Sequence, residues 1–327
     1  MKVQLSGGDD RNLMERLLEK QIPLANSCNG KGTCGKCKVK VVSGTITDVT
    51  DTERRLLTEK EVAGRMRLAC MTKARGEVVI ETGEVEEDHV FTTGGVEGHF
   101  KRDADKHGYG LAVDIGTTTV VATLICLDDG TERATYAQIN PQKTYGLDVL
   151  TRITYETEHK EAAISQLQKA IVQGLNEAAT AVCNEAGIEV TEITEIDVAA
   201  NCTMLHMLAG VDARSIGKAP YKPVFTDGRK LKTQVLGLVG ATDATVYLLP
   251  SVSAYIGADI VAGVYVCDLR HASGKTLFID IGTNGELVLE AGGNMYSCSC
   301  AAGPALEGMN ITSGMRAAKG AVEDVHI

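Results

Sequence analysis

The residues in this chain best suited to hold an inorganic group are four cysteines. Cys28, Cys34 and Cys37 fall within ten residues, and Cys70 follows after a strand-like stretch, giving the pattern C-x5-C-x2-C…C. Three glycines lie among the first three cysteines: Gly30, Gly32 and Gly35. Glycine permits the tight turns that a loop needs if its backbone is to wrap closely around a cluster. The pattern predicts that the four thiolates hold one [2Fe–2S] cluster.

Two other roles for these cysteines fit the spacing less well. Structural zinc sites usually take cysteines from two close pairs, and only Cys34 and Cys37 form such a pair. A disulfide framework is unexpected in a long chain whose first residues, 1–5, read as a strand and not as a secretory signal. The spacing therefore favours the cluster over zinc, and zinc over disulfides.

A second candidate site comes from a sequence that occurs twice, Asp-Ile-Gly-Thr between two apolar, strand-like stretches. Backbone N–H groups and hydroxyls at a Gly-Thr turn can hold phosphate, and an aspartate at a strand end can hold Mg²⁺ through water. The candidate residues are Asp114, Gly116, Thr117 and Thr118 in the first copy, and Asp280, Gly282, Thr283 and Asn284 in the second.

An ordinary hairpin would also place Asp and Gly at such a turn, for geometric reasons alone. For either copy by itself, the two interpretations stand equal. The repetition favours phosphate binding, because a hairpin needs no matching second copy. Two such turns predict two related lobes that clamp a nucleotide from opposite sides.

Short elements must position the cysteines. The expected elements are a strand at 3–5, a helix at 13–18 closed by Pro23, a strand at 38–42 with a turn at 43–44, a charged helix at 52–61 and a strand at 78–80. The Arg-Leu-Ala-Cys sequence at 67–70 delivers the fourth ligand. Residues 1–83 are thus predicted to form a small α+β unit with only one strand before its first helix.

The rest of the chain differs in composition. Residues 84–108 are polar, acidic and without an apolar period, which predicts a linker. From Tyr109 the pattern is α/β, with a long amphipathic helix at 164–182 that ends near Gly187. A buried strand is expected at 196–200. Asn201 is expected to cap a helix at 203–208, and a further helix is expected at 253–266.

Several other polar or sulfur-bearing residues have a structural interpretation beside a functional one. His206 is expected to be a packed or surface histidine, because no second histidine lies at metal spacing. Asp259 lies either in the nucleotide cleft or on a solvated helix face. Glu307 and Arg316 are candidate cleft residues or a surface ion pair. The remaining cysteines are expected in the core, with Cys298 and Cys300 at a buried strand end; the others are Cys126, Cys183, Cys202 and Cys267.

Composition excludes two classes of partner. The chain has 327 residues and a net charge of −10, which argues against nucleic acid because phosphate binding needs a basic face. No apolar run approaches the roughly 20 residues of a membrane span. Without tryptophan and with 4% aromatic residues, the core must be aliphatic. These features predict a cytoplasmic protein of about two domains.

The motifs together resemble those of one known family, the reductive activators of corrinoid proteins. Those proteins join a [2Fe–2S] domain to an ATPase domain of the sugar kinase, heat-shock protein and actin superfamily. Besides the cysteine loop, the similar stretches are 112–118, Asn140-Pro-Gln, Tyr145-Gly-Leu-Asp-Val, Ile256-Gly-Ala-Asp, 280–286 and 301–308. They occur in one order and cover nearly the whole chain.

The resemblance implies a function and a set of partners. The family returns an inactivated corrinoid cofactor from Co(II) to Co(I) on a partner protein of a methyltransferase system. One electron comes from the [2Fe–2S] cluster, a low-potential donor supplies it, and ATP with Mg²⁺ is coupled to the uphill step. A homodimer is left open. The main alternative is a plain [2Fe–2S] electron carrier with a degenerate nucleotide-binding domain; a small-molecule kinase and an activator of another low-potential enzyme fit less well.

The resemblance also implies the fold. It predicts a β-grasp ferredoxin-like domain at 1–83, the linker at 84–108, a first lobe of an actin-like (ribonuclease H-like) ATPase domain at 109–272, and the start of a second lobe at 273–327. An actin-like lobe is domain-sized, normally at least ~100 residues. The chain is therefore expected to be truncated at its C-terminus, with the second lobe incomplete.

Overall fold

The computed structural model describes residues 1–8, 10–20, 22, 24, 30, 32–33, 35–83, 103, 105–282 and 284–300. Within the chain, Met1–Glu87 and Gln142–Tyr155 group as one compact unit, and Asp88–Pro141 and Glu156–Ile327 as a second. None of the helices in these described parts is long and apolar enough to cross a lipid bilayer.

The first unit contains a four-stranded antiparallel sheet. Its strands are β1 (Lys2–Leu5), β2 (Lys38–Ile46), β3 (Met66–Leu68) and β4 (Ala74–Thr82), in the order β1-β4-β2-β3. Helix α1 (Leu13–Glu19) starts at a capping box between Asn12 and Glu15. It buries Leu13 and Leu17 completely in the core that it shares with the sheet. The predicted α+β unit, with one strand before its first helix, is confirmed.

Two local predictions for this unit were wrong. The expected turn at Ser43-Gly44 lies inside β2, where the pairing with β4 shifts register. Gly44 has φ +96°, and a Cβ there would lie 2.3 Å from Glu77 O, so glycine permits a bulge and not a chain reversal. The single helix expected at 52–61 is two, α2 (Asp51–Leu56) and α3 (Glu59–Ala63), because Leu57 is extended and Thr58 caps a new helix.

The second unit is built on a six-stranded sheet in the order β7-β6-β5-β8-β10-β9. Strands β5 (Tyr109–Ile115), β6 (Thr119–Cys126) and β7 (Glu132–Ile139) form an antiparallel meander. Strands β8 (Ile193–Ala200) and β10 (Thr245–Leu248) continue the sheet parallel to β5, and β9 (Arg229–Lys232) closes it antiparallel. This mixture of a meander and parallel strands is the α/β arrangement that was predicted.

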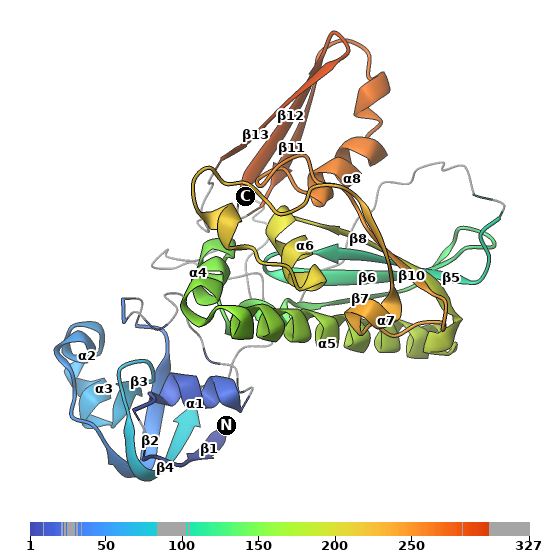
Figure 1. Cartoon of the computed structure of the whole chain (residues 1–327). Helices are drawn as coiled ribbons and strands as arrows, with labels where there is room; N and C mark the ends of the chain where they lie inside the picture. The colour runs from blue at the N-terminus through green and yellow to red at the C-terminus, as the bar shows by residue number, and fades with distance from the viewer. Residues whose placement is uncertain are drawn as a thin grey trace, which may run out of the picture. The chain divides into compact units, whose positions relative to one another are not determined.

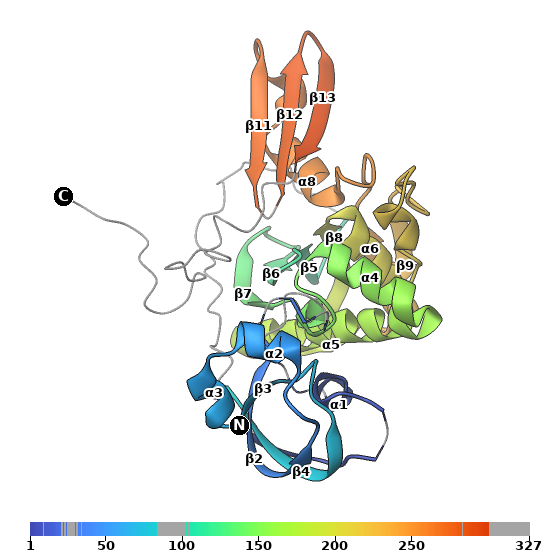
Figure 2. The ribbon, with the colours of Figure 1, turned by 90° about the vertical axis from the view of Figure 1, so that its left-hand side faces the viewer.

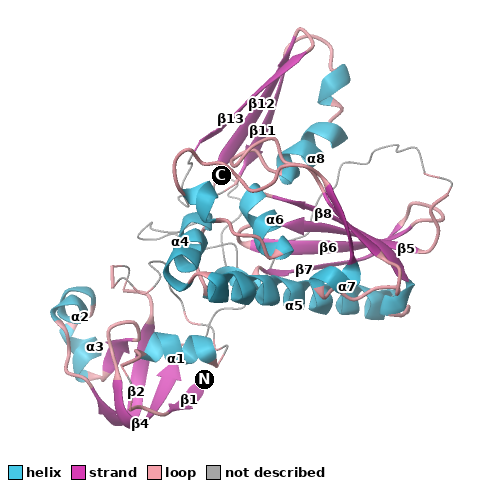
Figure 3. Cartoon of the chain, viewed as in Figure 1, coloured by secondary structure: helices cyan, strands magenta, loops and turns pink. Residues whose placement is uncertain are grey.

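Helices pack on this sheet. Helix α5 (Glu161–Ala186) runs along β6 and β7 and ends at Gly187, which is left-handed, as predicted (Figure 1). Helix α6 (Cys202–Ala209) packs against α5 and β8 (Figure 3). Helices α7 (Thr233–Leu236) and α8 (Ala258–Val266) contact β9 and β8, and short 3-10 turns lie between elements. Helix α4 (Val149–His159) begins in the first unit, which includes Gln142–Tyr155. Helix α8 starts five residues later than the expected 253, because Ser253–Ile256 form hydrogen-bonded turns.

A separate three-stranded antiparallel sheet ends the described chain. It consists of β11 (Thr276–Ile281), β12 (Gly285–Ala291) and β13 (Asn294–Cys300), which lie side by side (Figure 2). On one face, Phe278 and Val288 pack against Ile260 of α8. On the other face, Leu277, Ile279 and Ile281 are each more than half exposed.

Candidate functional site

Two of the four candidate cluster ligands lie in the described residues, and the structure brings them together. Cys37 precedes β2 and Cys70 follows β3, and both side chains are buried. Their Sγ atoms are 3.3 Å apart, too far for a disulfide bond between the two. Ala69 N donates to Cys37 O at 2.8 Å, which ties the two ligand segments to each other. The other two predicted ligands, Cys28 and Cys34, lie outside the described residues.

The three described glycines of the loop have a backbone conformation that suits tight turns. Gly30, Gly32 and Gly35 have φ of +80°, +69° and +65°, the left-handed region that side chains disfavour. A Cβ on Gly30 would lie 2.8 Å from Met14 Cε, and one on Gly32 would lie 3.0 Å from Met71 Sδ. These three positions therefore favour glycine, and those of Gly30 and Gly32 are tightly packed as well.

These features fit a four-thiolate group. Two thiol sulfurs point at one place without forming a disulfide, whose S–S bond would be about 2.05 Å. Among the residues the structure describes, no three His, Cys, Asp or Glu side chains form a metal-binding group. Cys28 and Cys34 are not among these residues. Two convergent cysteines, one at the end of a glycine-rich loop and one after β3, suit an iron–sulfur cluster.

The first Asp-Ile-Gly-Thr turn joins β5 to β6, as predicted. Asn140 Nδ2 donates to Gly116 O at 2.8 Å, and Asn140 N donates to Thr118 O at 2.8 Å. Asn201 Nδ2 donates to Thr117 Oγ1 at 3.1 Å. A Cβ on Gly116 would lie 2.9 Å from Thr119 O, so the turn requires glycine. The side chains of two asparagines from other elements thus hold the turn in one conformation.

The second turn joins β11 to β12 in the same way. Asp280 pairs with Glu286 across the two strands, and Gly282 N donates to Asn284 O at 2.9 Å. Thr283 lies outside the described residues. Each copy of the repeat is therefore a hairpin whose aspartate sits near the end of its first strand.

The two turns and helix α8 contribute neighbouring carboxylates to one acidic cluster: Asp114, Asp259, Asp280 and Glu286. Burial and the charges of Asp259 and Asp280 together raise the pKa of Asp114 to about 6. Burial and Asp280 likewise raise the pKa of Asp259. The pKa of Glu286 is raised by burial and by Asp259 and Asp280. These mutual repulsions mean that the carboxylates of the two turns lie near one another.

Asp259 belongs to this acidic cluster and is only partly exposed. It lies in the first turn of α8, where Gly257 passes so close to β8 that a Cβ would be 2.5 Å from Asn201 Cα. Sequence reasoning left its position open. The signal that could have placed it is the glycine two residues earlier, which allows the helix to approach the strand end.

Other candidate residues divide between confirmed and wrong predictions. His206 is packed, as predicted: its Nδ1 donates to Cys202 O at 2.7 Å, and its ring stacks on Phe225. Cys126, Cys183 and Cys202 are buried, as predicted. The prediction of burial was wrong for Cys267, Cys298 and Cys300, which are exposed. Glu307 and Arg316 lie outside the described residues.

The fold and the two sites define a class: an iron–sulfur domain of the ferredoxin type in one chain with an actin-like α/β domain. Sequence models of known families agree with this class. A 2Fe-2S iron-sulfur cluster binding domain matches residues 1–75, the RACo middle region matches 109–272, and the C-terminal domain of RACo, the ASKHA domain, matches 274–327. The chain belongs to the RACo family.

Individual relatives of this chain have names that refer to corrinoid proteins. The corrinoid activation enzyme RamQ of Eubacterium limosum is 34% identical over 223 residues, which cover 68% of this chain and 37% of RamQ. The [Co(II) methylated amine-specific corrinoid protein] reductase of Methanosarcina barkeri is 26% identical over 226 residues, covering 66% of this chain and 40% of the relative.

A solved structure, a reductive activator for corrinoid, iron-sulfur protein, matches with a TM-score of 0.62 and 28% identity. The match covers 95% of this chain and 64% of that one. The chain thus spans less than two thirds of each of these proteins, and about two fifths of the curated relatives.

Proposed function

We propose that this protein takes part in the ATP-dependent reductive activation of a corrinoid protein, taking the corrinoid cobalt from Co(II) to Co(I) for a methyltransferase system. The observation that carries the proposal is the combination of the cysteine loop and the two Asp-Ile-Gly-Thr turns in one chain. A plain electron carrier would have no use for the second feature. The names of the relatives support a corrinoid protein as the partner.

The cluster-binding role falls to Cys28, Cys34, Cys37 and Cys70. A bound [2Fe–2S] cluster supplies a one-electron carrier, which suits the one-electron change at cobalt. The protein's part is to hold the thiolates in place. The left-handed glycines shape the loop, and the Ala69-to-Cys37 hydrogen bond fixes the Cys70 segment against the start of β2. A low-potential electron donor completes the proposed system.

The nucleotide-binding role falls to the two turns: Asp114, Gly116, Thr117 and Thr118 on one side, and Asp280, Gly282, Thr283 and Asn284 on the other. Their backbone N–H groups and hydroxyls would bind the phosphates of ATP. A divalent cation would relieve the repulsion among the carboxylates that raises the pKa of Asp114. Because no three of the described carboxylates form a direct metal-binding group, Asp114 and Asp280 would hold Mg²⁺ through water.

The proposed domain boundaries follow the sites. Residues 1–83 carry the cluster, 84–108 link it to the ATPase-type domain, 109–272 form the first lobe, and 273–327 begin the second. The proposed location is the cytoplasm, and a homodimer is left to measurement. Nucleotide state would act by changing how the cluster domain and the corrinoid partner meet.

A combined spectroscopic and binding experiment tests the proposal. The protein is reconstituted with iron and sulfide, and its visible spectrum is recorded. Isothermal titration with Mg-ATP then tests the nucleotide site, on this chain and on a version carrying the C-terminal part of a relative. Reduction of a Co(II) corrinoid protein by a chemical reductant is followed by absorbance with and without Mg-ATP. A [2Fe–2S] spectrum with ATP-stimulated cobalt reduction is expected; reduction that ignores ATP would leave only the electron carrier.

A further inference from the structure

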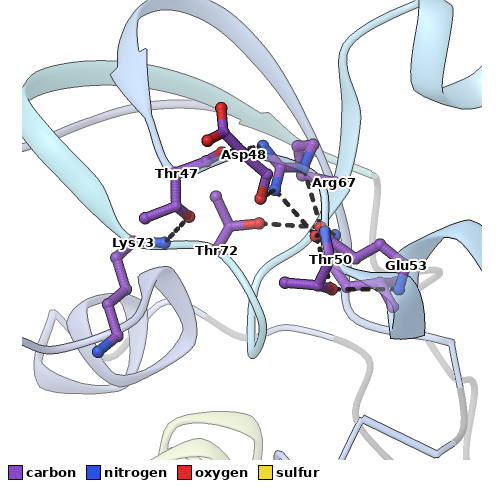
Figure 4. Close-up of polar contacts among 8 residues, drawn as sticks. Thr47, Asp48, Thr50, Glu53, Arg67, Thr72 and Lys73 are labelled. Atoms are coloured by element: carbon purple, nitrogen blue, oxygen red, sulfur yellow. Dashed lines mark hydrogen bonds and ion pairs between the residues drawn. The ribbon is translucent and has the colours of Figure 1, made fainter.

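A buried ion pair lies beside the cluster loop. Glu53 of α2 is fully buried and Arg67 of β3 is 3% exposed. Arg67 Nε donates to Glu53 Oε1 and Arg67 Nη2 donates to Oε2, both at 2.9 Å (Figure 4). The guanidinium also donates to Thr47 O at 2.7 Å and to Asp48 O at 3.0 Å. The pair is thus bidentate, with both charges hydrogen-bonded, as a buried ion pair requires.

The same carboxylate holds the chain on both sides of Cys70. Glu53 Oε1 accepts hydrogen bonds from Leu68 N and from Thr72 Oγ1, both at 3.0 Å. Leu68 lies two residues before the cysteine and Thr72 two residues after it. Met71 N donates to Leu68 O at 2.9 Å, which closes a turn around the ligand. One oxygen atom therefore fixes both ends of the segment that carries Cys70.

The other oxygen of Glu53 fixes α2. Glu53 Oε2 accepts from Thr50 N at 2.9 Å and from Thr50 Oγ1 at 3.0 Å, forming the capping box of the helix. Helix α2 in turn packs on the cysteine loop, because a Cβ on Gly32 would lie 3.2 Å from Thr52 Cγ2. Through one side chain, α2, β3 and the Cys70 turn are joined.

Helix α3 also begins with a capping box and serves as a comparison for Glu53. Glu61 of α3 forms the same box with Thr58 and an ion pair with Lys38 at 2.6 Å. That ion pair is part-exposed, and the hydrogen bonds of the Glu61 side chain go to Thr58 and Lys38. A buried arginine and contacts to a ligand-bearing turn are therefore additions at Glu53 that helix capping does not explain.

We propose that Glu53, fixed by Arg67, is a positioning residue for the cluster ligand Cys70. By fixing Leu68 and Thr72 it sets the path of the turn, and so the place of the Cys70 sulfur relative to Cys37. This inference rests on the proposed cluster-binding function. It goes further in assigning control of the ligand geometry to a carboxylate that does not touch the ligand.

Two threonine variants of the full chain separate positioning from stability. Thr72→Val removes the hydrogen bond to Oε1 on the Cys70 side, and Thr50→Val removes one to Oε2 on the helix side. Each is nearly isosteric and each takes one hydroxyl from the same carboxylate. Thr72→Ser, which keeps the hydroxyl, is the rescue variant. All are reconstituted with iron and sulfide and checked for folding by far-ultraviolet circular dichroism.

The readouts are the electron paramagnetic resonance spectrum of the reduced cluster, its midpoint potential, and the rate of cluster loss to EDTA. Loss of one buried hydrogen bond, ~1–2 kcal/mol, predicts cluster loss about 5- to 30-fold faster for Thr72→Val, with a changed resonance spectrum. Thr50→Val is expected to melt at a lower temperature with a wild-type spectrum, and Thr72→Ser to resemble the wild type.

The possible failures are distinguishable. If the wild-type protein takes up no [2Fe–2S] cluster, the proposed function and this inference both fail. If the wild type is loaded but Thr72→Val and Thr50→Val give the same spectrum and loss rate, only the positioning role fails. Equal cluster loss in Thr72→Ser and Thr72→Val would show that the hydroxyl contact is not responsible, and would also overturn it.

Discussion

Asn201 Nδ2 donates a hydrogen bond to Thr117 Oγ1 across 3.1 Å, while Asn201 Oδ1 accepts one from Met204 N at 3.0 Å. A single amide thus begins helix α6 and orients a hydroxyl of the first Asp-Ile-Gly-Thr turn. The helix cap and the candidate phosphate site depend on one side chain. A shorter side chain that still caps the helix but no longer reaches Thr117 can separate the two roles.

Asn201→Ser is expected to weaken nucleotide binding with little change in stability. Serine caps helices about as well as asparagine does, but its hydroxyl is too short to serve Met204 N and Thr117 together. Losing one net hydrogen bond of ~1 kcal/mol predicts a roughly 5-fold higher Kd for Mg-ATP. Titration calorimetry measures the affinity and a thermal melt measures the stability.

Asn201→Ala supplies the contrast, since it removes both contacts. It is expected to lose a further ~1 kcal/mol of stability from the missing helix cap. A serine variant that binds Mg-ATP as tightly as the wild type would show that the Thr117 contact has no part in nucleotide binding.

Because the pKa of Asp114 in the acidic cluster is raised, we expect nucleotide binding to strengthen as pH rises through about 6. Burial, Asp259 and Asp280 raise the pKa of Asp114 from 3.8 to about 6, so at pH 5 the folded protein holds a proton there. A protonated carboxyl does not attract a hydrated cation, and binding of Mg-ATP must displace that proton. Titrations between pH 5 and 8 are expected to give rising affinity, levelling off above pH 7.

The stability of the nucleotide-free protein should change with pH in the opposite direction to nucleotide affinity. A carboxyl with a raised pKa binds protons more tightly in the folded state, so stability falls as pH rises from about 4 to above 6. Asp114→Asn removes this titration, and should raise the melting temperature at pH 8 while weakening Mg-ATP binding much more at pH 8 than at pH 5. An unchanged pH profile in Asp114→Asn would assign the titration to another group.

Sequence patterns predicted the elements that local chemistry determines. The strands on either side of each Gly-Thr turn follow from apolar alternation, and the end of α5 follows from Gly187. Asn201 was recognised as a cap because it precedes a helical pattern. Each of these signals lies within a few residues of its consequence, which is why one sequence suffices to read it.

Predictions failed where distant contacts decide the outcome. Ser43-Gly44 has the composition of a turn, but pairing with β4 carries β2 through it as a bulge. Free cysteine is usually buried like a small apolar residue, yet Cys298 and Cys300 lie exposed on β13. The acidic cluster around Asp114 could be only half predicted. Its two turns repeat in the sequence, whereas Asp259 is brought to it by a close approach of α8 to β8. Such approaches depend on tertiary packing and leave little trace in local sequence.

His206 is expected to be required in its neutral form. Its Nδ1 donates to Cys202 O, and its Nε2 accepts from Val224 N at 3.1 Å, a contact that a proton on Nε2 would abolish. Burial lowers the pKa of His206 below 6.5, so its contribution to stability is complete above pH 6.5 and is lost as pH falls below that value. His206→Leu strands the Val224 N–H and is expected to cost about 1–3 kcal/mol.

The matched control is His271→Leu. His271 is largely exposed and paired with Asp268, so its replacement should change stability little. Thermal melts of both variants between pH 5 and 8 measure the effect. Loss of stability at low pH that persists unchanged in His206→Leu would show that a different group is protonated.

The capping glutamates of α2 and α3 are expected to differ sharply in their effect on the ferredoxin-like domain. Glu53→Gln leaves the Arg67 guanidinium buried without its counter-charge, which typically costs about 3–5 kcal/mol. Glu61→Gln changes a part-exposed ion pair, with a much smaller loss expected. Hydrogen exchange of peptides from residues 1–83, in the full chain, reports the stability of this domain alone.

Acid adds a second test of the same pair. Burial alone would raise the pKa of Glu53, but hydrogen bonds from Arg67, Thr50 and Leu68 lower it from 4.5 to about 2. A lowered carboxyl pKa contributes stability that is complete above pH 4.5 and lost as pH falls toward 2. Wild-type protection of the domain should therefore decline below pH 4.5, and Glu53→Gln should show a flatter decline. If the wild type and Glu53→Gln exchange alike at pH 7, the buried ion pair does not stabilise the turn that carries Cys70.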